Sequence, residues 1–385
     1  MTNIGGWDKI NIIYGSVTFV KLLIVRVFVL AIRILYAPMK LRKAQNKIVW
    51  LSRQSDKKSQ DMEMLSREIS RISPDTKQVF RLKRLKDESA LSLSYIFSIF
   101  GDMWEIANSK VAICDTYSIP LSCLNHKNDL KIVQIWHALG AVKKFSLQSV
   151  GKAQGRDSGV SKALCMHKNY DYVIAPSKKT AEFYCEAFGC SEDKIHIANL
   201  PRADVILDGT SRRDEFIKLN PEYAGKKIIA YLPTFRNDDD VIISNLHKVF
   251  ENDDKLGLVV SAHPLSAASE FYNFNGDFST YDLMKLADEI VTDYSACAYE
   301  ASLLNKPLRF FIPDYETYKN EQGLNVDMPQ IFADACFFDA GELLNAIKND
   351  EYDLEKLDGF SHTFVENRGN NNTNELAKFI CELMI

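Results

Sequence analysis

Short apolar stretches that alternate with helical ones constrain the fold of this chain more than any other feature. Each has the length of one strand and is rich in the β-branched and aromatic residues that strands favour. Strands separated by helices predict parallel sheets built of βαβ units, so we expect an α/β fold. Two series of such stretches predict two Rossmann-like domains facing a cleft: 47–53, 111–117, 131–138, 170–177 and 194–200, then 226–234, 256–264, 289–295 and 306–313.

Charged residues around 209–213 interrupt the pattern and mark the boundary between the two series. Helices are expected at 60–72 and at 179–189, the second ended by a glycine. The polar stretch 367–375 is expected to be a loop before a last helix, which could cross back to the first domain. The predicted divisions are 1–45 (a membrane-associating segment), 46–208 (the first Rossmann-like domain), 209–365 (the second Rossmann-like domain) and 366–385 (the last helix).

The net charge of −4 conceals an asymmetry between the first quarter of the chain and the rest. Residues 1–86 hold 18 of the 47 Lys and Arg residues and 6 of the 51 Asp and Glu residues. A basic segment on an acidic body indicates one anionic partner on one side. A membrane surface fits better than nucleic acid, because the basic region lacks the interleaved aromatics of a nucleic-acid platform.

The apolar segment 10–36 is long enough to cross a bilayer, but Lys21, Arg26 and Arg33 interrupt it. Arg26, Arg33 and Lys40 are seven residues apart and fall on one helical stripe, as in a helix that lies in the membrane interface. A true span and a helix packed on the body are the alternatives. Basic clusters favour the cytoplasmic leaflet, so residues 10–47 and 81–86 predict peripheral or monotopic binding to the cytoplasmic face of a membrane.

The eight cysteines are scattered, with no Cys-x-x-Cys pair and no zinc spacing. We expect reduced thiols in a cytosolic compartment. The basic segment is also unlike a cleaved signal peptide, because its apolar core is late and charged.

Polar residues follow four of the predicted strands, where parallel sheets bind ligands. The four strand ends are Trp136-His137-Ala138, 233–236, His263-Pro264 and 292–295. Taken singly, each has an ordinary structural explanation, such as a helix cap for the Asp-Tyr-Ser turn. The sequence holds no Gly-x-Gly-x-x-Gly, no Walker loop and no Gly-x-Ser-x-Gly elbow, which removes the main support for dinucleotide, P-loop and α/β-hydrolase chemistry.

Taken together, these stretches resemble the CDP-glycerol glycerophosphotransferase family, the teichoic-acid primases and polymerases. The resemblance covers most of residues 46–330 and rests on motifs in the same order. They are "QIWHALGAVKKF" with His137, Lys143 and Lys144; "NLPRADVIL" with Arg202 and Asp204; "PTFR" with Thr234 and Arg236; "HP" at His263; "TDYSA" with Thr292, Asp293, Ser295 and Ala296; and "DYETY" with Asp314 and Tyr318.

The resemblance implies a GT-B architecture and a reaction in which a hydroxyl of a lipid-linked glycan or polyol-phosphate acceptor attacks the β-phosphorus of CDP-glycerol, releasing CMP. It implies His137 as general base and His263 as a second catalytic residue that holds phosphate. Arg236, Thr234 and the 292–296 turn would bind the donor, with Asp293 orienting its neighbours. The remaining motif residues, Arg202, Asp204, Lys143, Lys144, Asp314 and Tyr318, would support them. No metal and no cofactor are expected.

The chain departs from the motif pattern at Ala138, at 199–200 and at Ala296, and Lys143 and Lys144 lie about one residue further on. These departures leave CDP-ribitol open as the donor. A primase-like or short capsule-type enzyme fits better than a long-chain polymerase. A nucleotide-sugar glycosyltransferase and a membrane-docked scaffold with a degenerate GT-B body are the remaining alternatives, and a homo-oligomer stays open.

Overall fold

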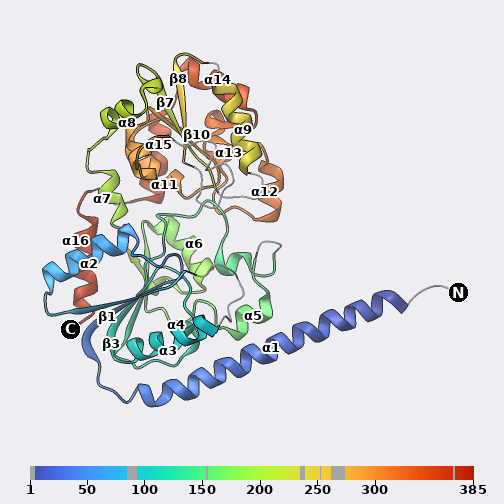
Figure 1. Ribbon diagram of the computed structural model, residues 1–385, viewed down its shortest axis with the longest axis vertical. Coiled ribbons are helices and arrows are strands. Elements are labelled where there is room, and N and C mark those ends of the chain that lie inside the picture. Colours follow the sequence, from blue (N-terminus) through green and yellow to red (C-terminus); the bar gives the residue numbers. More distant parts are fainter. Residues whose placement is uncertain are drawn as a thin grey trace.

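The computed structural model describes residues 5–84, 93–152, 155–234, 239–251, 253–261, 274–366 and 369–385. Two parallel sheets, one from each half of the chain, lie along the long axis of the molecule with helices around each (Figure 1). The α/β class and the two-sheet organisation that the alternating pattern predicts are therefore confirmed.

The first sheet has the strand order β2-β1-β3-β4-β5-β6, and every pair in it is parallel. Central strand β1 is buried from Lys47 to Ser52 because both faces of a sheet of this kind are covered by helices. Edge strand β2 was not predicted, since its side chains are half-buried and its apolar pattern is weak. The strands are β1 Gln45–Ser52, β2 Lys77–Leu82, β3 Ser109–Cys114, β4 Lys131–Gln134, β5 Tyr172–Ala175 and β6 Ile195–Ile197.

The second sheet has the order β11-β10-β9-β7-β8 and is also parallel throughout. The four predicted strands of the second series are all present, and each ends before the predicted apolar stretch does. The two-residue strand β11 was not predicted. The strands are β7 Lys227–Leu232, β8 Leu256–Val260, β9 Glu289–Thr292, β10 Leu308–Phe311 and β11 Cys336–Phe337.

The helices follow the capping signals of the sequence. Helix α2 spans Gln60–Ile72 as predicted, with the Ser59 hydroxyl accepting from the Met62 backbone N–H. Helix α6 (Lys178–Phe188) is followed by Gly189, whose left-handed backbone conformation ends the helix. The other α-helices around the sheets are α3 Leu93–Ala107, α4 Ile119–Cys123, α5 Ser158–Ala163, α6 Lys178–Phe188, α7 Arg202–Ile206, α8 Arg213–Leu219, α9 Asp239–Phe250, α10 Thr280–Leu286, α11 Cys297–Ala301, α12 Tyr315–Glu321, α13 Met328–Ile331, α14 Ala340–Asn349, α15 Leu354–Phe364 and α16 Asn372–Glu382.

Helix α16 returns to the first sheet and packs against α2 (Figure 1). Phe379 stacks on His196 of β6 at a centroid distance of 3.6 Å, and Asn374 donates to Glu68 of α2. The preceding helix α15 packs against α6. One continuous apolar core contains side chains of both sheets and of α16, so the halves share a core instead of meeting at a thin interface.

The carboxyl ends of the two sheets face each other, because the loop after β4 packs on the segment after β9. A methyl group on Gly140 would overlap the ring of Tyr299 in α11, so only glycine permits this approach. The same loop pairs further on with the second half, where Lys143 and Leu324 form an antiparallel bridge. The sheet ends at which polar residues were predicted therefore lie at the junction between the halves.

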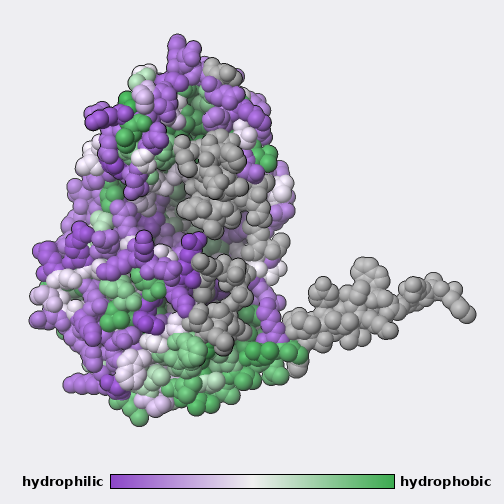
Figure 2. Space-filling model, in the orientation of Figure 1, coloured by the Kyte–Doolittle hydropathy of each residue, from purple (hydrophilic) through white to green (hydrophobic). Residues whose placement is uncertain are grey.

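Helix α1 (Gly5–Met39) has two apolar faces. One buries Val25, Val29, Ile32 and Tyr36 against the body, where α1 contacts α3 and α5. The other is exposed, with Val27, Leu30 and Ile34 each 58–63% accessible. In Figure 2 this segment is an apolar band along one end of the molecule, away from the mainly hydrophilic surface.

The helices in the described part of the chain include none with an apolar stretch long and uncharged enough to cross a bilayer, so the alternative of a span is not supported. Two residues of the predicted basic surface also lie elsewhere. Lys47 is buried in β1 and paired with Glu105 at 2.7 Å. The Arg33 Nε donates to the carbonyl of Cys123 at 2.7 Å and so turns toward the body.

Candidate active site between the two sheets

His137 lies directly beyond β4, at the junction of the two halves. The backbone of the preceding Trp136 has a φ of 54°, a strained turn that lets the indole lie against the imidazole at a centroid distance of 3.9 Å. The Nδ1 of His137 lies 2.9 Å from the backbone carbonyl oxygen of Asp115. A carbonyl only accepts, so Nδ1 carries the hydrogen and the lone pair is left on Nε2.

The pKa of His137 is lowered to about 4. Burial is the main cause and the positive charge of Arg202 adds to it, while the hydrogen bond to the Asp115 carbonyl opposes both. The imidazole is therefore neutral at pH 7. A neutral imidazole with its free lone pair on Nε2 has the form that a general base needs.

Asp115 supports this arrangement and was not predicted. Its carboxylate accepts from the hydroxyl of Ser52 at 3.0 Å, while the other carboxylate oxygen has no partner. Burial raises the pKa of Asp115 to about 7, with the hydrogen bond from Ser52 opposing the shift. The residue follows the apolar strand β3, so the strand-end rule that selected the other candidates would also have selected Asp115.

Asp293 joins the carboxyl ends of β9 and β7 across the second sheet. Its carboxylate accepts from the backbone N–H of Thr234, at 2.8 and 3.0 Å, and from that of Ser295, at 3.1 Å. Thr292 adds a second link between the strands, since its hydroxyl donates to the carbonyl of Leu232 at 2.7 Å. The Thr234 hydroxyl is buried and has no hydrogen-bond partner among the described residues. Asp293 thus positions the backbone of Thr234, whose hydroxyl remains available to a ligand.

Ser295 and Ala296 are partly exposed in the turn before α11. The Ser295 hydroxyl accepts from the backbone N–H of Cys297 at 3.3 Å. Helix α11 has only 5 residues and continues as a 3₁₀ turn, so its dipole is weaker than that of a long helix. An anion at this turn would depend on the local N–H groups and on the serine.

Asp314 and Tyr318 both contact Tyr294 of the same turn. The Tyr294 hydroxyl donates to Asp314 at 3.1 Å, and the rings of Tyr294 and Tyr318 stack at 3.9 Å with an angle of 6° between their planes. The spacing Asp-x-x-x-Tyr therefore places a hydrogen-bond acceptor and a ring around one buried tyrosine, which fixes the 292–296 turn on its sheet.

Arg202 ties the two halves together. It bonds to Asp61 of α2 through Nε at 2.9 Å, and to Glu300 of α11 through a second nitrogen at 2.7 Å. Asp204 has a different role, because its carboxylate accepts from the backbone and side chains of Asn372 and Thr373 at the start of α16. Both residues of the Pro-Arg-x-Asp motif thus hold segments that are distant in sequence.

Lys143 and Lys144 belong to the strip that joins the halves. The Lys144 backbone N–H donates to the carbonyl of Gly323 at 2.9 Å, next to the bridge of Lys143 with Leu324. Their backbones contact the second half directly. Arg236 and His263 lie outside the described residues, so the structure does not place these two candidates. Among the described residues, no three His, Cys, Asp or Glu side chains converge in a way that could hold a metal ion.

Residues 35–382 match the sequence model of the CDP-glycerol:poly(glycerophosphate) glycerophosphotransferases. The chain belongs to this family. It is therefore an enzyme of the CDP-polyol phosphotransferase class, and the resemblance inferred from its motifs is confirmed.

Curated relatives in the family include primases and polymerases. The chain is 29% identical over 310 residues to a teichoic acid ribitol-phosphate primase of Bacillus spizizenii, covering 76% of this chain and 79% of the relative. It is 27% identical over 288 residues to a teichoic acid glycerol-phosphate primase of Bacillus subtilis, covering 72% and 74%. A poly(ribitol-phosphate) polymerase of Bacillus spizizenii is 26% identical over 83% of this chain but only 54% of its own length.

Solved structures confirm the GT-B-like fold. A variant of the wall teichoic acid polymerase TagF soaked with CDPG superposes with a TM-score of 0.67 at 20% identity, covering 98% of both chains. A Staphylococcus aureus MnaA–UDP complex superposes with a TM-score of 0.54 at 12% identity, covering 88% of this chain and 98% of the other.

Within this glycerophosphotransferase fold, the described candidates form two groups. His137 stands on the first sheet, and the loop that it begins packs through Gly140 on α11, the helix that Ser295 and Ala296 precede. Arg202 spans the same junction. Asp61 and Glu300 were not predicted as the partners of Arg202, because both are distant from it in sequence: Asp61 lies in α2, and Glu300 lies in α11, just after the 292–296 motif.

Proposed function

We propose that this enzyme transfers glycerol phosphate from CDP-glycerol, or ribitol phosphate from CDP-ribitol, to a hydroxyl of a lipid-linked polyol-phosphate acceptor. The acceptor oxygen forms a bond to the β-phosphorus while the bond from that phosphorus to the bridging oxygen breaks, and CMP leaves with that oxygen. The hydroxyl proton passes to Nε2 of His137.

The observation that carries the proposal is the tautomer of His137. The Asp115 carbonyl occupies Nδ1, and burial keeps the ring neutral, so Nε2 can accept a proton at neutral pH. A degenerate scaffold would have no need to hold a histidine in this form next to the junction between two sheets. This geometry favours an enzyme over a scaffold.

The donor diphosphate would lie at the carboxyl ends of β7 and β9. Support comes from the unpartnered hydroxyl of Thr234 and from the partly exposed Ser295, both oriented by Asp293. Small side chains at Ala296 and Cys297 leave room for phosphate oxygens near the backbone N–H groups. From the sequence motifs alone, Arg236 and His263 would add positive charge and hydrogen-bond donors there.

Among the activities of the family, the matches with known relatives support a primase. The matches with the two primases extend over about three quarters of each primase, whereas the polymerase match spans about half of the polymerase. One primase is named for ribitol phosphate and the other for glycerol phosphate, and they are 29% and 27% identical to this chain. The choice between glycerol and ribitol therefore has to come from the assay.

The test is release of CMP from CDP-glycerol and from CDP-ribitol with a panel of lipid-linked acceptors, with the product identified by mass spectrometry. One added polyol phosphate per acceptor is the expected result for a primase. Repeated addition would identify a polymerase. Turnover only with a nucleotide sugar would overturn the proposal in favour of a glycosyltransferase.

We further propose that the exposed face of α1 contacts the cytoplasmic face of the membrane, where a lipid-linked acceptor lies. Support comes from the stripe of Leu23, Val27, Leu30 and Ile34, which is exposed at helical spacing. Phe97 of α3 extends this surface. Of the basic residues, Lys40, Arg42 and Lys43 remain near the end of the helix to meet anionic lipids.

Deleting residues 1–40 would also uncover the core that Val29 and Ile32 fill, so a gentler change is needed. Replacing Leu23, Val27, Leu30 and Ile34 by Gln should abolish flotation with anionic vesicles while leaving transfer to a soluble acceptor intact. A matched control replaces exposed apolar residues of the second half by Gln: Leu219, Val241, Phe338 and Leu354. Equal loss of flotation in both variants, or none in either, would contradict the membrane surface.

A further inference from the structure

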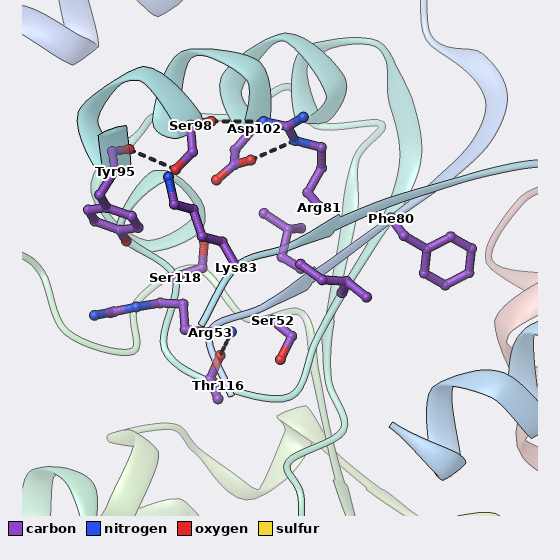
Figure 3. Close-up of a pocket in the computed structure, with 12 residues that line it drawn as sticks. Ser52, Arg53, Phe80, Arg81, Lys83, Tyr95, Ser98, Asp102, Thr116 and Ser118 are labelled. Carbon is purple, nitrogen blue, oxygen red and sulfur yellow. Dashed lines mark hydrogen bonds and ion pairs between the residues drawn. The ribbon is translucent and has the colours of Figure 1, made fainter. Parts of the chain in front are cut away.

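A polar cavity opens at the carboxyl ends of β1, β2 and β3 (Figure 3). Its lining includes none of the proposed donor-binding residues. Its volume is about 230 Å³, below the range of about 300–1,000 Å³ that is usual for larger ligands. The walls include Ser52, Arg53, Arg81, Lys83, Tyr95 and Thr116. Its size suits one small group of a ligand better than a nucleotide.

Arg53 is a partly buried guanidinium without a counter-charge. In the described part of the chain it pairs with no carboxylate, and its side chain donates only to the carbonyl of Tyr117 at 3.3 Å. Burial lowers the pKa of Arg53, partly offset by the hydroxyl-bearing rings of Tyr95 and Tyr117. A desolvated cation is costly unless an anion compensates for it.

A second arginine increases that cost. The guanidinium carbons of Arg53 and Arg156 lie 5.7 and 5.6 Å from the centroid of the same Tyr117 ring. The charge of Arg156 further lowers the pKa of Arg53. Arg156 also has no carboxylate partner among the described residues. Arg156 is not among the residues that line the cavity, so it acts on Arg53 through its charge. An anion beside Arg53 would offset that repulsion.

Arg81 shows how the fold treats a cation that it neutralises itself. Its Nε donates to Asp102 at 2.8 Å, and the pair lines the same cavity (Figure 3). Lys83 lies beside it on the wall. Arg81 and Lys83 therefore belong to the cavity instead of the open basic surface that residues 81–86 were expected to form.

The cavity adjoins the proposed base through the end of β3. Thr116 lines the cavity and accepts from the Arg53 backbone N–H at 3.1 Å. Its neighbour Asp115 holds His137 through its carbonyl and receives a hydrogen bond from Ser52, another wall residue. A ligand bound by Arg53 could thus extend toward Nε2 of His137.

We propose that this cavity binds the phosphate group nearest the acceptor hydroxyl, with Arg53 as its cationic contact. This inference rests on the proposed function. It makes the first sheet selective for acceptors that already carry a phosphate, and it assigns Arg53 to substrate selection, a role that none of the motif residues fills.

The test compares a soluble polyol-phosphate acceptor with the same polyol lacking phosphate. Replacing Arg53 by Ala should raise KM for the phosphorylated acceptor about 10-fold or more, because it removes a charged hydrogen bond. KM for the CDP-linked donor and for the unphosphorylated polyol should stay within about twofold. The matched control is Arg67→Ala on α2, whose side chain is 77% exposed. Unchanged acceptor KM in Arg53→Ala, or a rise in donor KM instead, would overturn the proposal.

A binding measurement separates this inference from the proposed function. Glycerol 3-phosphate should show a broadened ³¹P signal with the wild-type protein and a sharp one with Arg53→Ala, while the thermal unfolding of both proteins stays alike. Absence of broadening with the wild type would refute the cavity as a phosphate site. Broadening lost in Arg53→Ala, but no turnover of any CDP-polyol by the wild type, would refute the proposed function and leave only an anion site.

Discussion

The Nδ1 atom of His137 lies 2.9 Å from the backbone carbonyl oxygen of Asp115, so a main-chain group and not a side chain sets the tautomer of the proposed base. A backbone carbonyl cannot be removed by substitution and does not titrate. The orientation of the imidazole is therefore built into the end of β3, and it persists whatever the protonation state of the Asp115 carboxyl.

Replacing His137 by Ala should reduce kcat by about 10²- to 10⁴-fold, the usual contribution of a general base. The donor KM should change little, because the ring is not among the proposed donor contacts. Steady-state CMP release measures both quantities. His362→Ala is the control, since this histidine lies exposed on α15, and it should behave as the wild type.

The pH profile gives an independent check on the same residue. A base whose pKa is lowered from 6.5 to about 4 remains unprotonated in mildly acidic solution. The acid limb of kcat/KM should therefore fall near pH 4 and not near pH 6.5. An acid limb at pH 6.5 would assign the titrating base to another group.

Asp115 should make the protein less stable as the pH rises. Its pKa is raised from 3.8 to about 7, so the folded state binds more protons than the unfolded state between these values, and stability falls as pH increases through this window. Asp115→Asn cannot ionise and should be more stable than the wild type at pH 8, by up to on the order of 4 kcal/mol.

The advantage of Asp115→Asn should vanish below about pH 3, where the wild-type carboxyl is protonated in both the folded and the unfolded state. Thermal unfolding of the two proteins from about pH 3 to 8.5 measures the difference. Asp334→Asn, at a side chain that is 89% exposed, serves as the control. A difference that does not depend on pH would show that Asp115 does not carry the raised pKa.

Arg202→Met should cost about 3–5 kcal/mol of folding free energy, because it leaves the buried carboxylates of Asp61 and Glu300 without their counter-charge. Urea unfolding provides the measurement. Arg67→Met, which breaks an exposed pair with Glu63, should cost less than about 1 kcal/mol. Equal costs for the two variants would mean that Arg202 does not bind the halves together.

Ser295→Ala should raise the donor KM by about 10-fold through loss of a hydrogen bond to phosphate. Loss of its bond to the Cys297 N–H should cost only about 1 kcal/mol of stability. Ser302→Ala is the matched control, since this buried hydroxyl donates within the chain to Tyr299. If both serine variants lower the unfolding temperature and neither changes the donor KM, Ser295 is only a cap.

Sequence periodicity predicted the strands because a strand covered on both faces needs an unbroken apolar run, as at Ile48 to Leu51. It also pointed to the strand ends, where Asp293 and His137 were found. Periodicity failed at β2, whose side chains are only half-buried. Lys47 begins the predicted strand 47–53, but it was also counted with the basic surface, and in the fold it is buried because Glu105 neutralises it.

Long-range partners could not be predicted from one sequence. Arg202 had many acids available to it, and only the folded chain selects Asp61 and Glu300, one from each half. The same limit applied to Arg81, which was counted with a basic surface cluster because nothing near it in the sequence shows that Asp102 neutralises it.

The return of α16 to the first sheet governs the order in which the protein can be completed during synthesis. All six strands of that sheet have been made by Ile197, yet α2, with the buried side chains of Leu65 and Ile69, packs against α16, which carries Leu376 and Ile380. A nascent chain must keep this face of α2 open until residues 372–382 emerge. The first half is thus not an autonomous folding unit, and expressing the halves as separate polypeptides would require the second to supply its final helix to the first.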